Sequence, residues 1–285
     1  MLRWGVLYVL ILFVSTCTGL LLTSCRGSGG SVYRLSMSTK GAPSLTADVH
    51  VEVVSDFACP WCYVGKARLK AAIEAYERSA KPEDKSRSGA KVHVSFHPYM
   101  IDTRTHPDGE DYLAYNKRRW GGDGWTASMK SRSARKDGCE FANWTTWPNS
   151  LRAHCLQKFV EDTGKGDEAS FRPLVFQTIY ERGGNASDLE TLVSLAEEVG
   201  LSPAEARAYL SSQKGEDQVR REDHGAKTEL DVGGVPYFIV RGAAKAGSAA
   251  AGSSDGGNSG YSEVTLNGAV GPDQLLRAFT AVSRG

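Results

Sequence analysis

Residues 55–66 read SDFACPWCYVGK, and the patterns on either side of this stretch decide the fold. Before it, valines alternate with polar residues and predict a strand over 49–54. After it, apolar residues recur at helical spacing and predict a helix over 59–79. Two cysteines that are two residues apart, Cys59 and Cys62, therefore stand at the turn from a strand into a helix.

The spacing of these cysteines predicts redox chemistry. Cys59 lies where the free N–H groups and the dipole of the helix favour an anion, so we expect it to be the attacking thiolate. Cys62 lies one turn further in and would resolve the mixed disulfide that forms on Cys59. Pro60 suits the first helical position, because the N–H that it lacks would have no partner there. Trp61 is expected to be exposed, where it either contacts substrate or tunes the redox potential.

A structural role for the dithiol is the alternative. A C-x-x-C pair is half of many zinc sites, but structural zinc sites usually pair two such motifs and this chain has one. A static disulfide would close too small a loop to stabilise much. Cys139 and Cys155 are predicted to be free thiols. The strand histidines, His50, His93 and His97, are interpreted as ordinary residues, and no metal is predicted.

A second motif precedes a strand predicted over 237–241. Pro236 stands where a strand would begin, although proline cannot donate to a sheet ladder. We predict a cis bond between Val235 and Pro236 that turns a backbone edge toward the dithiol, where an extended substrate could pair. Pro236 is thus counted with the two cysteines as catalytic, and Val235, Pro60 and Trp61 as substrate-binding.

The rest of the chain separates into strand-forming and helix-forming parts. A second strand over 92–97 completes a β-α-β unit with a parallel pair. Residues 102–231 show no convincing strand and are interpreted as mainly helical. Within them we expect a helix capped by Ser187, a helix capped by Ser202, a helix over 219–230, and partial loop over 118–138. A strand over 261–266 and a final helix from Pro272 follow the low-complexity residues 242–260.

Together these features resemble the thioredoxin fold of the DsbA family. The β-α-β and β-β-α halves, the C-P-W-C turn and the V-P pair carry the resemblance over residues 49–284. Residues 55–66 are similar to the S-D-x-x-C-P-W-C-Y-x-G stretch of the FrnE-like branch. Residues 149–156 and 234–238 are similar to its N-T-x-x-A-H-x-L and G-V-P-x-F segments. The resemblance implies an α/β thioredoxin-like fold with a large helical insertion. It also implies protein dithiol–disulfide oxidoreductase activity, with Cys59 nucleophilic and Cys62 resolving.

One departure concerns proton transfer at the resolving thiol. Many thioredoxin-fold proteins carry a buried acid where this chain has Val53. Proton transfer to or from Cys62 then falls to Asp56, to Glu52 or to water. Asp56 is the nearest acid, and it could equally cap the helix.

Composition and the N-terminus bound the class and the compartment. The 285 residues are 41% hydrophobic with a net charge of +1, which excludes a mostly disordered chain, a polytopic membrane protein and general nucleic-acid binding. Residues 1–25 are expected to be a signal peptide or signal anchor, and 26–47 a linker. The thioredoxin-like part would span 48–101 and 231–285, around a helical lobe over 102–230. The chain would be luminal or periplasmic, touching a membrane only through an uncleaved 1–25, or cytosolic if translation starts at Met37.

Three functional hypotheses follow. The first is a thiol–disulfide oxidoreductase that acts on protein thiols and disulfides, with no cofactor other than glutathione as a redox partner. The second is a glutathione-dependent isomerase or transferase of the 2-hydroxychromene-2-carboxylate isomerase or kappa-class type. Those enzymes share the topology but generally have Ser at the first thiol position, so the presence of both cysteines favours redox work. The third is a binding module whose dithiol is structural or holds metal.

Overall fold

A computed structural model describes residues 48–79, 89–242 and 262–283. The predicted leader (1–25), the linker (26–47) and residues 243–260 of the low-complexity segment lie outside these ranges. Of the helices within the described ranges, none combines the length and the apolar character that a membrane span requires.

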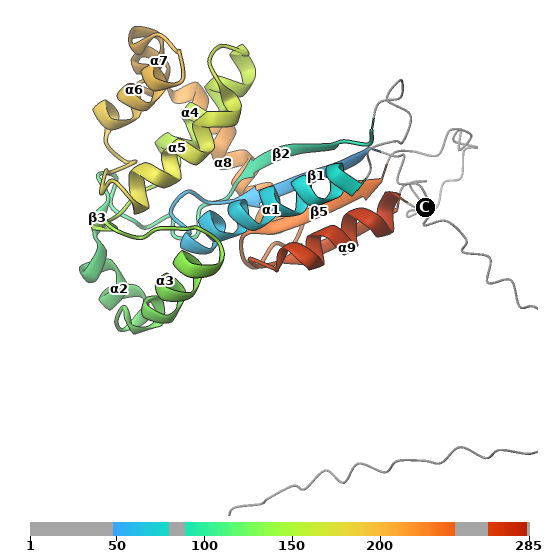
Figure 1. Cartoon of the computed structure of the whole chain (residues 1–285). Helices are drawn as coiled ribbons and strands as arrows, with labels where there is room; N and C mark the ends of the chain where they lie inside the picture. The colour runs from blue at the N-terminus through green and yellow to red at the C-terminus, as the bar shows by residue number, and fades with distance from the viewer. Residues whose placement is uncertain (1–47, 80–88, 243–261, 284–285) are drawn as a thin grey trace, which may run out of the picture. The chain divides into compact units, whose positions relative to one another are not determined.

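Four strands form the main sheet, in the spatial order β2-β1-β5-β6. Their bounds are β1 Val49–Ser55, β2 Val92–Pro98, β5 Tyr237–Gly242 and β6 Glu263–Asn267. β1 pairs parallel with β2 and antiparallel with β5, which in turn pairs antiparallel with β6. Figure 1 shows the twisted sheet with β1 between β2 and β5. The predicted β-α-β and β-β-α order is confirmed.

Two helices cover one face of this sheet. They are α1, Pro60–Ser79, and α9, Pro272–Ser283, which pack against each other in front of the strands in Figure 1. The alternating valines of β1 point into this layer and contact apolar residues of both helices, among them Tyr76 and Phe279. This core holds the middle and end of α1 against the sheet, through Leu69, Ala72 and Tyr76.

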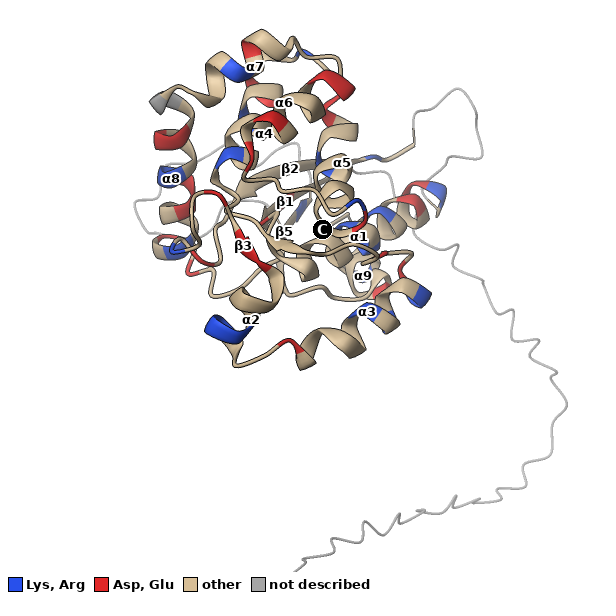
Figure 2. Ribbon diagram, turned by 90° about the vertical axis from the view of Figure 1, so that its left-hand side faces the viewer, with Lys and Arg blue, Asp and Glu red and all other residues tan. Residues whose placement is uncertain are grey.

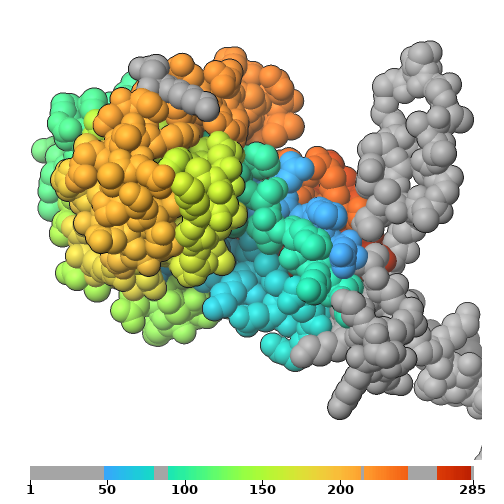
Figure 3. Space-filling view, turned by 90° about the horizontal axis from the view of Figure 1, so that it is seen from above, coloured from blue at the N-terminus to red at the C-terminus, as the bar shows by residue number. Residues whose placement is uncertain are grey.

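Seven further helices lie between β2 and β5 in chain order. They are α2 Tyr112–Trp120, α3 Gly124–Lys136, α4 Leu151–Thr163, α5 Glu168–Tyr180, α6 Leu189–Glu198, α7 Pro203–Leu210 and α8 Gln213–Thr228. Helices α4 to α8 pack on one another, and Figure 3 shows their yellow-green to orange residues gathered at one side of the blue and cyan residues of β1 and α1. A second core fills these helices and reaches the active-site turn through Phe57.

Several sequence predictions for this helical region are wrong. Two short strands, β3 Glu110–Asp111 and β4 Thr146–Trp147, pair where no strand was expected. The stretch 118–138 is partly loop as expected, at residues 121–123 and 137–138, and the rest of it forms α3 and the end of α2. Helix α8 begins six residues before the predicted start at 219.

The predicted cap of α6 is also wrong, whereas that of α7 is confirmed. Asp188, not Ser187, caps α6 by accepting the Thr191 N–H. The Ser187 hydroxyl is already used, because it accepts the Asn149 N–H at 2.7 Å. Ser202 caps α7 as expected, by accepting the N–H of Glu205.

Candidate active site

The two cysteines of the candidate active site lie at the turn from β1 into α1. The Cys59 N–H donates to the Asp56 carbonyl at 3.2 Å, and the Cys62 N–H donates to the Cys59 carbonyl at 3.0 Å. Helix α1 begins at Pro60, so Cys59 stands at its N-terminal end, as the sequence predicts. Both cysteines are free thiols and both are buried, with exposed fractions of 6% for Cys59 and 2% for Cys62. Trp61 between them is 36% exposed, which confirms that expectation.

The loop before β5 comes to the first thiol. The Val235–Pro236 peptide bond is cis, which confirms the prediction. The Sγ of Cys59 lies 3.6 Å from the Val235 carbonyl oxygen, in hydrogen-bonding position. Gly65 on α1 makes room for the proline, because a Cβ at this position would lie 2.7 Å from Cγ of Pro236. Two motifs more than 170 residues apart in the chain thus meet at Cys59.

The second thiol is held in its protonated form. The Asp56 N–H donates to Sγ of Cys62 at 3.4 Å. Burial, together with the neighbouring Cys59 sulfur, raises the pKa of the Cys62 thiol well above its usual range. At neutral pH Cys62 therefore carries a proton that it must lose before it can act as a nucleophile.

The Asp56 side chain closes the turn that carries the dithiol. One carboxylate oxygen accepts the Ala58 N–H at 3.0 Å, and the other accepts the Ile101 N–H at 2.8 Å. The first oxygen also lies 3.5 Å from Nε2 of His154, which is as fully buried as Asp56 itself. This carboxylate ties the active-site turn to the chain after β2 and to α4.

The other acid considered for proton transfer lies elsewhere. Glu52 is partly exposed and pairs with Arg241 on β5 and with His97 on β2, both on the face of the sheet turned away from α1. Val53, at the position where many relatives of the fold have an acid, is buried in the apolar layer beneath α1. Of these two residues, Asp56 is the one that contacts the dithiol, through its backbone N–H to the Cys62 sulfur.

A buried cation lies behind the active-site turn, and the sequence analysis missed it. The guanidinium carbon of Arg172 on α5 lies 4.9 Å from the ring centre of Phe57 and 3.7 Å from that of Phe96. Burial lowers the pKa of Arg172 to about 10, while the negative charge of Glu161 and, after it, a negative charge on Cys62 act in the opposite direction. Arg172 therefore stays cationic at neutral pH and favours the thiolate of Cys62. The one local signal is an isolated arginine in the apolar stretch FRPLVF.

A cleft opens beside Cys59 with a volume of about 620 Å³. The turn into α1, the chain after β2 and the loop before β5 contribute one side of its lining, and α2, α3 and β4 contribute three tryptophans and one arginine. The lining residues are Cys59, Pro60, Trp61, Tyr99, Ile101, Arg119, Trp120, Trp125, Trp147, Gly233 and Gly234. Of the residues expected to bind substrate, Pro60 and Trp61 line this cleft, and Val235 contacts Cys59 from the loop.

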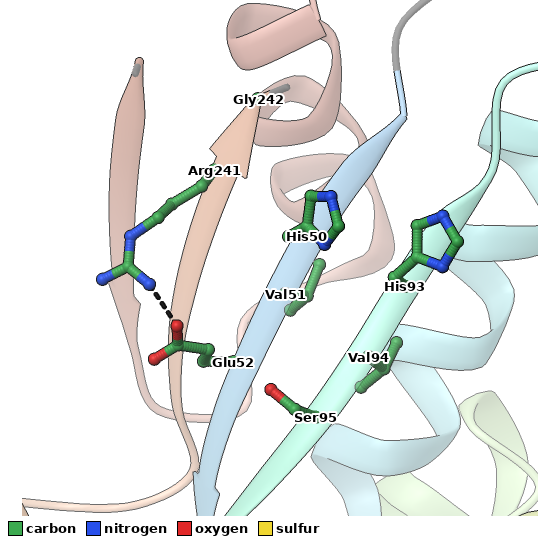
Figure 4. Close-up of a pocket in the computed structure, with 8 residues that line it drawn as sticks. All are labelled: His50, Val51, Glu52, His93, Val94, Ser95, Arg241 and Gly242. Atoms are coloured by element: carbon green, nitrogen blue, oxygen red, sulfur yellow. Dashed lines mark hydrogen bonds and ion pairs between the residues drawn. The ribbon is translucent and has the colours of Figure 1, made fainter. Parts of the chain in front are cut away.

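The strand histidines lie apart from the dithiol. His50 and His93 stack with ring centres 5.0 Å apart beside a shallow hollow that also includes Glu52 and Arg241 (Figure 4). The hollow lies beside the start of β1, whereas the dithiol comes after the end of β1. Across the described ranges, His, Cys, Asp and Glu side chains do not gather in a group of three that could hold a metal ion.

The two remaining cysteines of the described chain are free, as predicted, and lie in the core. Burial raises the pKa of Cys139 to about 11 and that of Cys155 to about 12. An unfolded thiol titrates near pH 8.5. Above that pH the unfolded chain loses protons that the native chain keeps, so these groups make stability fall as pH rises toward 11 or 12.

We therefore expect the reduced protein to lose stability between pH 8 and pH 10. Urea unfolding at several pH values measures this slope. The Cys139→Ala and Cys155→Ala proteins should each show a shallower slope than the parent chain, whatever their stability at pH 8. Equal slopes in all three proteins would contradict the assignment of buried thiols with raised pKa values.

Comparison with known proteins places this site in a family. Residues 50–279 match the DSBA-like thioredoxin domain. YwbO of Bacillus subtilis (strain 168), described as an uncharacterized protein, is 30% identical over 194 residues, which are 67% of this chain and 86% of that protein. The crystal structure of a "probable DsbA oxidoreductase" of Streptomyces coelicolor superposes with a TM-score of 0.63 at 22% identity, over 82% of this chain and 89% of that one.

The alternative family considered above shares the fold more distantly. A 2-hydroxychromene-2-carboxylate isomerase superposes with a TM-score of 0.50 at 18% identity, covering 82% of this chain and 95% of the isomerase. At these identities the superpositions establish the fold, and the domain match establishes the family. The predicted α/β thioredoxin-like fold is confirmed, and the chain belongs to the DSBA-like thioredoxin domain family of thiol oxidoreductases.

Proposed function

We propose that this protein is a thiol–disulfide oxidoreductase that acts on protein substrates through Cys59 and Cys62. The observation that carries the proposal is the contact between Sγ of Cys59 and the carbonyl of Val235, beside the cis proline Pro236. This contact sets a thiol at a helix N-terminus against a backbone edge where an extended chain could pair. A second thiol stands one helical turn away to resolve the product.

The chemistry follows from the different environments of the two thiols. The Cys59 thiolate attacks one sulfur of a substrate disulfide, forms a mixed disulfide and expels the other substrate sulfur as a thiolate, which takes up a proton. Cys62 then loses its proton and attacks Sγ of Cys59, which releases the second substrate thiol. The dithiol has become a disulfide and the substrate has gained two electrons. The reverse sequence oxidises a substrate dithiol.

Proton removal from Cys62 is the step that the site must assist. Asp56 is our choice of proton acceptor, because its backbone N–H contacts the Cys62 sulfur and its buried carboxylate accepts the Ala58 N–H in the same turn. Arg172 would stabilise the charge that forms. Glutathione, as disulfide or thiol, would recycle the dithiol. We place this work in a secretory, luminal or periplasmic space, on the expectation that residues 1–25 form a signal or anchor, and in the cytosol if translation starts at Met37.

Equilibration in glutathione buffers tests this function. After alkylation and mass spectrometry, we expect one reversible disulfide, between Cys59 and Cys62, while Cys139 and Cys155 remain thiols. The same protein should catalyse disulfide exchange in an unfolded protein substrate. A dithiol that stays reduced at every glutathione ratio, or that co-purifies with zinc, would contradict the proposal. Isomerisation of 2-hydroxychromene-2-carboxylate by the Cys62→Ser protein with glutathione would support the isomerase instead.

A further inference from the structure

The outer wall of the cleft beside Cys59 is made of aromatic side chains from the helical part of the chain. Trp120 at the end of α2 and Trp125 at the start of α3 meet edge to face with ring centres 6.3 Å apart. Trp147 lies deeper and stacks on Tyr115. With Trp61 from the active-site turn, they make four tryptophans beside one reactive sulfur. We call this set the tryptophan wall.

The tryptophan wall includes apolar surface that the fold leaves uncovered. Large exposed apolar side chains are few in the described ranges, namely Trp61, Leu113, Trp120 and Leu230, and two of these four line the cleft. Trp120 is 50% exposed, yet Trp125 beside it is fixed, because its indole N–H donates to Asn116 at 3.0 Å. An exposed apolar surface on a fixed support is typical of a binding site.

The charge at this wall has one sign. Arg119 is the single charged side chain among the residues described as lining the cleft, and its guanidinium carbon lies 4.4 Å from the ring centre of Trp120. Its nearest acid, Asp102, is 3.8 Å away and is engaged more closely by Arg104 and Arg118. Lys117 and Arg118 precede it, and Figure 2 shows the blue end of α2. An acidic group would therefore be attracted to this end of the cleft.

The opposite wall is backbone. Gly233 and Gly234 line the cleft immediately before Val235, whose bond to Pro236 is cis, and a Cβ on Gly233 would meet no atom within 4 Å. Main-chain groups without side chains leave room for an extended peptide to pair along this edge. A peptide whose cysteine reaches Cys59 would then extend neighbouring side chains toward the tryptophan wall.

We propose that the cleft selects the substrate segment around the reacting cysteine, taking a large apolar or aromatic side chain on the tryptophan wall and an acidic side chain at Arg119. This inference rests on the proposed function and adds the class of peptide that it acts on. Glutathione matches the cleft less well, because it has carboxylates but no large apolar group to cover the indole rings.

The test compares short peptides that carry one cysteine as a mixed disulfide with 2-mercaptoethanol. Three peptides are compared. In the first the cysteine is flanked only by glycines, in the second by phenylalanine and glutamate, and in the third by phenylalanine and lysine. The Cys62→Ser protein attacks each peptide sulfur, keeps the peptide on Cys59 and releases 2-mercaptoethanol, so intact mass spectrometry gives the rate. Bis(2-hydroxyethyl) disulfide, which has no side chains to recognise, reports on the thiol alone.

We expect the phenylalanine–glutamate peptide to react about fivefold or more faster than the glycine peptide, the ratio that one aromatic contact of about 1 kcal/mol gives. In the same background, Trp120→Ala should remove most of this advantage and Arg119→Glu should reverse the preference between glutamate and lysine. Each peptide rate is divided by the rate of the same protein with bis(2-hydroxyethyl) disulfide, so that any effect of a substitution on the Cys59 thiol itself is removed from the comparison. The matched controls are Leu113→Ala on α2 and Arg135→Glu on α3, exposed residues outside the cleft, and they should behave like the parent protein.

Three results would overturn the inference. Equal rates for all peptides would remove the subsite, and a mixed disulfide of glutathione that reacts faster than every peptide would assign the cleft to glutathione. An unchanged glutamate preference in Arg119→Glu would remove the acidic contact. Because the small disulfide is measured in the same protein, these failures differ from a failure of the proposed function, in which that disulfide would not react either.

Discussion

The Cys59→Ser protein should retain no measurable disulfide-exchange activity, a loss on the order of 10³-fold or more in turnover. The reason is geometric as well as chemical. Cys59 alone has its sulfur at the helix N-terminus, against the Val235 carbonyl and open to the cleft. Cys62 cannot replace it, because Cys62 is buried and its raised pKa keeps it protonated at neutral pH. Turnover of a disulfide-bonded protein substrate measures the loss.

Two control variants separate this effect from the loss of any thiol. Cys139→Ala and Cys155→Ala remove buried cysteines that do not line the cleft, and both should keep nearly full turnover at neutral pH. Far-UV circular dichroism of Cys59→Ser should match that of the parent protein, because the substitution exchanges one atom. Full activity in the Cys59→Ser protein would be incompatible with the proposed function.

Replacement of Asp56 by alanine should destabilise the protein by about 2–6 kcal/mol. The carboxylate accepts two backbone N–H groups, from Ala58 and Ile101, at a site that is 1% exposed. Without it both donors stay buried and unpaired, at a cost of about 1–3 kcal/mol each. Because these bonds fix the turn, the Asp56 N–H would also hold the Cys62 sulfur less firmly. Urea unfolding of the reduced protein measures the change.

Asp48 offers a matched control at the other end of β1. Its carboxylate also accepts a backbone N–H, from Lys91, but its side chain is 47% exposed and water can replace the lost bond. Asp48→Ala should cost about 1 kcal/mol or less. If the Asp56→Ala and Asp48→Ala proteins were equally stable, the turn-closing role of Asp56 would be wrong.

The Asp56→Asn protein tests the proton-transfer role of the carboxylate. Slower release of the mixed disulfide, with an altered pH profile, is expected only if the carboxylate accepts the proton of Cys62.

The turn that carries the dithiol was predictable because its signals are local. The alternating valines of β1, the helical spacing in α1 and the C-P-W-C turn lie within one continuous stretch, and each depends on neighbours a few residues away. The cis proline was predictable for two reasons. A proline is unusual at the start of a strand, and the C-P-W-C motif elsewhere in the chain gives such a proline a role. Gly65 shows a limit, because the need for a glycine there arises from Pro236, which only folding brings to α1.

The helical part was less predictable for a physical reason. Helix α5 is buried around most of its circumference, so its apolar residues do not form one stripe that a helical period would reveal. It also contains Pro173, a residue that usually interrupts helices. Helix α4 buries polar residues, among them His154 and Lys158, which blurs its pattern. Arg172 contacts Phe57 and Phe96 across long sequence separations, and no spacing rule connects them. The tryptophans of the cleft are likewise assembled from three separate segments.

The most direct test of the central claim is the location of the trapped intermediate. The Cys62→Ser protein, mixed at neutral pH with a disulfide-bonded substrate, should accumulate one mixed disulfide per chain, and peptide mapping should place it on Cys59. The Cys59→Ser protein should accumulate none. An adduct on Cys139 or Cys155, or an equal yield of adduct in the Cys59→Ser protein, would contradict the assignment of Cys59 as the attacking thiol.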